Sequence, residues 1–140
     1  MTRDGARARA LLAQGYTCAF VRGAEEKTSR ERGILPLLRL CEGSPWRGFS
    51  AADKIVGKAA ALLYAYLGAK EVYAETLSRA GEDVLQAHGI ACEYGVRTDT
   101  IVNHRGDGIC PMEEAAQELS DPENAAKALR AKFYAEMRHA

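Results

Sequence analysis

The sequence predicts a three-layer α/β fold, in which helices cover both faces of a mixed β-sheet. Three observations lead to this prediction: segments with helical apolar spacing alternate with short β-prone segments, residues 16–30 have the pattern of a hairpin, and 47% of the 140 residues are apolar. A hairpin followed by alternating helices and strands is typical of a sheet with both antiparallel and parallel pairs. We expect a single domain over residues 1–140.

The N-terminal part predicts a helix, a hairpin and a second helix. Asp4–Gln14 carries alanines and leucines on one side and is followed by a glycine, which favours a helix. Tyr16–Val21 and Glu26–Arg30 are the expected strands of the hairpin. The apolar spacing and early proline of Ile34–Leu40 favour a short helix, with a strand as the alternative. Glu42–Phe49, rich in glycine and proline, is the loop that follows.

Residues 50–67 predict a long central helix around which the other elements are arranged. Ser50 can cap its first turn, alanine and leucine dominate, no proline interrupts it, and a glycine follows its end. Its apolar side chains cover most of the circumference, so the helix should be buried on several sides. In such a helix Asp53 lies at the start, and Lys54 and Lys58 share one polar face.

The C-terminal half predicts two further strands and three helices. The segment that starts at Ile90 should pair with the preceding strand, because a helix between two strands makes a parallel crossover. In order, we expect a strand over Glu71–Ala74, an amphipathic helix over Ser78–His88 with Ala80, Val84 and Leu85 inward, a strand over Ile90–Val96, an extended segment over Thr98–Asn103, a helix that begins at Pro111, and a last helix from Asp121-Pro122 to about Met137.

Composition and charge exclude several functional classes. Lysines and arginines number 19, as do aspartates and glutamates, so no overall field favours nucleic acid. No apolar run approaches the roughly 20 residues of a membrane span, and no signal peptide is evident, so we expect a cytoplasmic protein. The four cysteines are far apart and the three histidines are isolated, so we expect no metal and no cofactor.

A set of polar residues at the ends of the predicted elements forms the candidate site. In α/β folds ligands bind where strands end and helices begin, so these side chains are expected to converge. Two lysines on one face would suit a phosphate or carboxylate, which predicts a small anionic or nucleotide-like ligand. The alternative is a surface pair of lysines with an aspartate that caps its own helix. The set comprises Asp53, Lys54, Lys58, Glu75, Ser78, Asn103, Cys110 and Glu113.

Cys110 has the most specific local chemistry of the set. A thiol at a helix N-terminus faces the positive end of the helix dipole, which favours the nucleophilic thiolate. Asp53 or Glu113 would then transfer protons as the general acid or base. The alternative is a buried thiol with no reactivity, in which case Glu113 caps its own helix. The sequence is compatible with both interpretations.

Three stretches of the chain carry a resemblance to a known family. They are residues 52–61 (ADKIVGKAAA), residues 71–78 (EVYAETLS), and Ile101-Val102-Asn103 together with residues 108–113 (GICPME). They resemble a small uncharacterised prokaryotic family, a domain of unknown function with a cytidine-deaminase-like fold, over about Tyr16–Leu129. The resemblance implies a deaminase-like core over about 16–129 and a C-terminal helix to about 137.

The resemblance also implies that this chain departs from the zinc deaminases. In those enzymes a His-x-Glu element begins the central helix and a Pro-Cys-x-x-Cys element begins the next one. Here the two places are taken by Asp53-Lys54-Ile55 and by Leu77-Ser78-Arg79-Ala80, so the zinc ligands are missing. We therefore expect a metal-free module that binds a small ligand, with an enzyme that uses Cys110 as the alternative. The fold analogy is also compatible with a homodimer.

Overall fold

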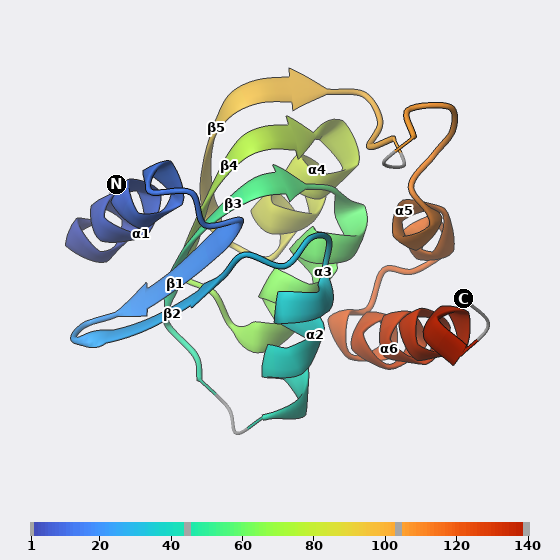
Figure 1. Cartoon of the computed structure of the whole chain (residues 1–140), viewed down its shortest axis with the longest axis horizontal. Helices are drawn as coiled ribbons and strands as arrows, with labels where there is room; N and C mark the ends of the chain where they lie inside the picture. Colours follow the sequence, from blue (N-terminus) through green and yellow to red (C-terminus); the bar gives the residue numbers. More distant parts are fainter. Residues whose placement is uncertain (1, 44–45, 103–104, 139–140) are drawn as a thin grey trace.

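The computed structural model describes residues 2–43, 46–102 and 105–138 (Figure 1). Helices and strands alternate along most of the chain, as predicted from the sequence. In chain order the elements are α1 (Arg3–Ala13), β1 (Cys18–Arg22), β2 (Glu25–Ser29), α2 (Leu35–Glu42), β3 (Ser50–Val56), α3 (Lys58–Leu67), β4 (Glu71–Ser78), α4 (Arg79–Ala87), β5 (Ala91–Thr98), α5 (Pro111–Ala116) and α6 (Pro122–Arg138).

The five strands form one mixed sheet in the order β2-β1-β3-β4-β5. β1 pairs antiparallel with β2 and with β3, whereas β3, β4 and β5 are parallel to one another. The parallel pairs are joined by α3 and α4, as crossover connections require. This topology confirms the predicted α/β class, the hairpin and the pairing of the last two strands. No helix in the described ranges is long and apolar enough to cross a membrane.

The prediction of one helix over residues 50–67 is wrong in its first half. Ser50–Val56 forms the central strand β3, and α3 begins only at Lys58, after Gly57. Alanine-rich segments favour helices locally, but pairing with β1 and β4 on both sides outweighs this weak preference. Asp53 and Lys54 therefore lie on a strand, and Lys54 and Lys58 do not share a helical face.

Smaller departures concern the next two elements. β4 continues to Ser78, so Glu75 lies within the strand and not after it. On α4, Leu85 is buried and Val84 half-buried as predicted, but Ala80 is exposed. Between β5 and α5 the described residues form an isolated bridge between Val102 and Ile109, and the expected extended segment over Thr98–Asn103 forms no strand after Thr98 in its described part.

Two apolar cores lie on opposite faces of the sheet. The larger one lies between the sheet and α3, with α2, α4, α5 and α6 around that helix (Figure 1). The smaller one lies under α1, where Ala8 packs against Ala19 and Ala52. Small side chains let α1 approach the strands closely, which explains the alanine at position 52 of β3.

The three parallel strands share a bend near their carboxyl ends. Lys54, Glu75 and Gly95 lie side by side on β3, β4 and β5, and the ladder of paired residues is interrupted at these three positions. Beyond them the strands pair again in the same register. The strands curve together over the helices (Figure 1). A Cβ on Gly95 would lie 3.0 Å from the carbonyl oxygen of Glu75, so the backbones are close here. The bend reverses the alternation of side chains: Val56 and Leu77 face the larger core, as do residues 51, 72 and 74 before the bend.

Candidate functional site

Glu113 is the residue around which the carboxyl ends of β3 and β4 are organised. Its side chain reaches from α5 to the N-terminus of α3, where Oε1 accepts from the amide of Lys58 at 2.7 Å and Oε2 accepts from the amide of Ala59 at 2.6 Å. A carboxylate in this position satisfies two helix-start amides and interacts favourably with the helix dipole. Glu113 thus caps a neighbouring helix, an arrangement that the sequence did not indicate.

Gly57 makes room for this carboxylate. A Cβ at this position would come within 2.0 Å of Glu113 Oε1. The backbone of Gly57 is extended, with φ −106°, so its conformation does not require glycine. The space for Glu113 is the reason that only glycine fits.

Ser78 lies beside the same point, at the start of α4. It is buried, and its hydroxyl accepts a hydrogen bond from the amide of Gly81 at 2.9 Å, which caps the helix. A Cβ on Gly81 would lie 3.0 Å from the carbonyl group of Gly57, so the starts of α3 and α4 are in contact. The predicted convergence therefore holds for Lys58, Ser78 and Glu113.

The expected pair of cationic side chains is not formed. Lys58 Nζ donates to the carbonyl oxygen of Gln117 at 2.9 Å and ties α3 to the end of α5. Lys54 is exposed at the bend of β3, next to Glu75 on β4. The Glu113 carboxylate occupies the N-terminus of α3, where an anionic ligand could otherwise bind. The chain's own carboxylate therefore takes the place predicted for the ligand. Asn103 lies outside the described residues.

Cys110 precedes α5 directly and is half-buried. Its amide donates to the carbonyl oxygen of Ile101 at 3.0 Å, which fixes the start of the helix. Of the two proton-transfer groups predicted for this thiol, Glu113 is bound to the amides of α3 and Asp53 accepts from Tyr64.

Asp53 faces α3 and forms a hydrogen-bonded pair with Tyr64, which is fully buried, whereas Asp53 is half-buried. The phenol of Tyr64 donates to Asp53 Oδ2 at 2.7 Å, and the backbone of Ile55 and Lys54 also stabilises this carboxyl group. The amide of Lys54 donates to the carbonyl oxygen of Thr17 at 3.2 Å. Burial raises the pKa of Asp53 from 3.8 to about 7, and the hydrogen bonds only partly offset it. Burial likewise raises the pKa of Tyr64, with the negative charge of Asp53 as the next cause. Asp53 thus stabilises the structure beside the bend in β3 through hydrogen bonds.

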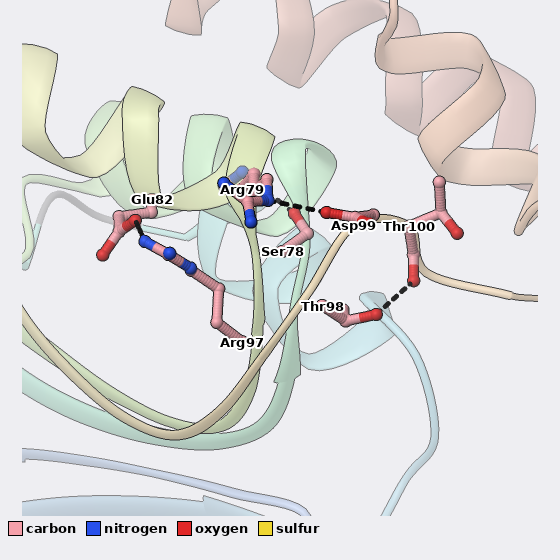
Figure 2. A network of polar contacts seen from close by, with 8 residues as sticks. Ser78, Arg79, Glu82, Arg97, Thr98, Asp99 and Thr100 are labelled. Atoms are coloured by element: carbon pink, nitrogen blue, oxygen red, sulfur yellow. Dashed lines mark hydrogen bonds and ion pairs between the residues drawn. The ribbon is translucent and has the colours of Figure 1, made fainter.

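Charged side chains at the ends of β4 and β5 are paired with one another (Figure 2). Arg79 donates to Asp99 Oδ1 at 2.6 Å, and Arg97 donates to Glu82 Oε1 at 2.9 Å. Arg79 and Asp99 are well exposed, so their pairing contributes little to stability. These pairs join α4 to β5 and to the segment after it. Each arginine is paired with a carboxylate of the chain itself.

A cavity of about 350 Å³ lies at the opposite, amino-terminal edge of the parallel strands, beside the start of α1. Residues of β3, β4 and β5 form one part of the lining, and the start of α1 forms the other. The lining residues are Thr2, Gly5, Ala51, Glu71, Val72, Tyr73, Ala91, Cys92 and Glu93. None of the predicted site residues is among them.

Glu71 is the buried carboxylate of this cavity, with 8% of its surface exposed. The Thr2 hydroxyl donates to Oε2 at 2.5 Å, and the Thr2 amide donates to Oε1 at 3.3 Å. Thr2 also caps α1, whose positive dipole end stabilises the carboxylate nearby. On the same wall, the guanidinium of Arg9 lies 4.2 Å from the centre of the Tyr73 ring and holds that ring in place.

The comparisons with known proteins agree on one family. Residues 7–133 match TM1506, a domain of unknown function (DUF1893). The chain belongs to this family. Its fold is similar to that of a DUF1893 family protein (TM1506) from Thermotoga maritima, with a TM-score of 0.85 and 20% identity over 95% of this chain and 92% of the other. No curated protein matches it.

The described residues of this DUF1893 chain do not fit a zinc centre. Within the ranges that the structure describes, no three His, Cys, Asp or Glu side chains lie close enough together to hold a metal. The helices that follow β3 and β4 begin with Gly57-Lys58-Ala59 and Ser78-Arg79-Ala80, which offer neither imidazole nor thiolate.

Sequence reasoning missed Glu71 and Tyr64. A glutamate at the start of an otherwise apolar strand was the available signal for Glu71, since such a residue needs a partner when the strand is buried. No local pattern pointed to Tyr64, because its partner Asp53 was placed on the same helix and not on a strand facing it.

Proposed function

We propose that this protein is a metal-free domain with a cytidine-deaminase-like fold that binds a small nucleotide-like metabolite in the cavity beside Glu71. The binding group of the ligand would be its base, and not its phosphate. The fold assignment is supported by the order of elements: a helix and a hairpin come first, then helices alternate with three parallel strands beside an antiparallel one.

The buried carboxylate of Glu71 is the observation that carries the binding proposal. An ionised carboxylate has about four sites that can accept hydrogen bonds. Thr2 uses two of them, so Glu71 retains capacity for donors on a ligand. Glu93 adds a second acidic residue to the lining, and Tyr73 adds an aromatic ring on the same face of the sheet. This chemistry suits a flat, apolar ring with N–H donors and disfavours an anion.

A thermal-shift screen tests this proposal. Cytidine and adenosine form the donor-bearing set, and ribose 5-phosphate with glucose 6-phosphate forms the anionic set. We expect stabilisation by a member of the first set that is lost in Glu71→Gln and in Ala91→Leu, which fills the cavity from an exposed position. Lys54→Ala, far from the cavity, is the matched control and should keep the shift. Stabilisation by the anionic set alone, or a shift that both cavity variants retain, would contradict the proposal.

The metal-free part of the proposal has its own measurement. Elemental analysis of the purified protein should give zinc far below one equivalent, because the described residues supply no ligand set. Stoichiometric zinc that survives dialysis against a chelator would overturn this part.

The enzyme with Cys110 as nucleophile remains the alternative, and the structure sharpens its test. Burial raises the pKa of Cys18 to about 12 and that of Cys41 to about 11, and it also raises the pKa of Cys92. Iodoacetamide should therefore label Cys110 first even if it has no special reactivity. The informative comparison is with N-acetylcysteine at the same pH: a nucleophile must react faster than this free thiol, and a slower reaction rejects the alternative.

A further inference from the structure

The cavity beside Glu71 opens on one face of the sheet. Side chains alternate along a strand, so Glu71 and Tyr73 lie on one face of β4, whereas Val72 faces the larger core. On β5, Ala91 lies opposite Glu71 and Glu93 lies opposite Tyr73. The two pairs therefore lie on the face that carries α1, beside the first turn of that helix.

Ala91 leaves room beside the carboxylate of Glu71. It is exposed, its side chain is a single methyl group, and β5 is an edge strand of the described sheet. On the other side of the carboxylate, the Thr2 hydroxyl donates to Oε2 and the Thr2 amide donates to Oε1. Each oxygen thus has one donor from Thr2 and keeps a second acceptor position. A flat ring that enters over Ala91 can meet both oxygens with one of its edges.

Two acceptor oxygens of one carboxylate favour a ligand with two adjacent donors. In such a bidentate pair each oxygen accepts one of two parallel N–H bonds, which adds geometric specificity to the strength of a charge-assisted contact. Among the common nucleobases, only guanine in its neutral form has two adjacent donors on one edge, the ring N1–H and the 2-amino group. Adenine and cytosine place a ring nitrogen beside their amino group, and this acceptor would face a carboxylate oxygen.

We propose that the cavity takes ligands of the guanine class, and that the two carboxylate oxygens of Glu71 accept from the N1–H and the 2-amino group of the base. This inference rests on the proposed function, because it names the base that the cavity would bind. Glu71 is then the residue that determines specificity, and Thr2 is a positioning residue that fixes the carboxylate from behind.

Equilibrium dialysis of the full chain against single nucleosides tests this assignment. Inosine lacks the 2-amino group of guanosine, and 1-methylguanosine lacks the N1–H, so each keeps only one of the two donors. We expect each of them to bind about tenfold more weakly than guanosine or worse, since one hydrogen bond to a charged group is lost. Adenosine and cytidine, with an acceptor beside the amino group, should be weaker by at least the same factor.

A change of the acceptor pair tests the role of Glu71. Glu71→Gln offers one acceptor and one donor, which matches the ring nitrogen and amino group of adenine and no longer matches guanine. We expect guanosine to bind about tenfold more weakly or worse, and adenosine to bind more tightly than guanosine. Glu118→Gln, exposed and outside the cavity, is the matched control and should keep the original order.

Two kinds of result distinguish a wrong base from a wrong site. If inosine, adenosine or cytidine binds the unmodified protein as tightly as guanosine, the guanine assignment is wrong, but the cavity proposal stands provided that Ala91→Leu weakens the binding. Methylguanidine that binds as tightly as guanosine would also overturn the assignment, because the carboxylate would then select a guanidinium group. If no nucleoside binds, both proposals fail. Circular dichroism checks folding, and Ala91→Leu, at an exposed position, replaces Glu71→Gln if that variant does not fold.

Discussion

The carboxyl group of Asp53 supplies hydrogen bonds next to the bend in the central strand, where the pairing of β3 with β4 is interrupted. At the bend the backbone of Ile55 and Lys54 stabilises the carboxyl group of Asp53, and Tyr64 donates a hydrogen bond to the same group. Buried polar groups need such partners, and the cost of burying the charge appears as the raised pKa. A residue that resembles a general acid in isolation therefore has a structural explanation.

The raised pKa of Asp53 predicts how stability depends on pH. Between pH 3.8 and about 7 the native state retains a proton that the unfolded chain has released. The native state then binds more protons, so this group lowers stability as pH rises, by at most about 1.4 kcal/mol per pH unit. Urea denaturation at several pH values should show that Asp53→Asn removes this contribution. Asp83→Asn, exposed on α4, should leave it in place, and equal pH profiles for all three proteins would contradict the assignment.

The contact between Gly57 and Glu113 gives a second prediction at the residue scale. Gly57→Ala should displace the Glu113 carboxylate from the amides of α3 and lower the free energy of unfolding by roughly 2–3 kcal/mol. Gly43→Ala is the matched control, since Gly43 is also extended and its Cβ would meet nothing nearer than 3.7 Å.

A double-mutant cycle makes this test specific. In a Glu113→Ala background the clash is gone, so Gly57→Ala should become nearly neutral. The same loss of stability in both backgrounds would show that Glu113 is not the reason for glycine at this position.

At the scale of elements, α3 is the helix on which the larger core depends. It contacts the sheet on one side and α2, α4, α5 and α6 on the others. Leu63 is fully buried in this core, so Leu63→Ala should cost about 2–5 kcal/mol. Leu11→Ala, on the less buried face of α1, should cost clearly less by the same denaturation measurement. Equal losses would mean that the two cores contribute similarly.

Most helices and strands could be predicted from the sequence because their local signals agree with their final environment. Gly68 ends α3 with φ +79°, and Pro111 and Pro122 begin the helices expected of them. β3 could not be predicted in this way, because Ser50–Val56 contains alanine and lysine and resembles a helix start. Only its two neighbouring strands and the close approach of α1 make it a strand.

The candidate site was predicted less well than the fold, for a related reason. Lys58, Ser78 and Glu113 converge because helix starts do gather at the carboxyl ends of parallel strands. Whether the helix starts at this edge of the sheet are accessible to a ligand depends on side chains from segments that are distant in the sequence. Here Glu113 occupies the start of α3, and that contact joins residues far apart in the sequence.

For the whole molecule, balanced charge predicts how the protein behaves in solution. The formal net charge is zero and the isoelectric point is about 6.8. Proteins without net charge repel one another least, so solubility at low ionic strength should be lowest near neutral pH and should rise on either side. Precipitation by polyethylene glycol across this pH range measures it, and solubility that changes in one direction only would contradict the prediction.

The shared bend in β3, β4 and β5 also limits how the sequence can change. Lys54, Glu75 and Gly95 occupy one level of the sheet, and each strand reverses its inward and outward positions there. An insertion or deletion in a single strand would move its later side chains to the wrong face. A change of length in this part of the chain is therefore tolerable only when all three strands change together. Single substitutions of the outward-facing residues beyond the bend, Ile55, Thr76 and Val96, are not restricted in this way.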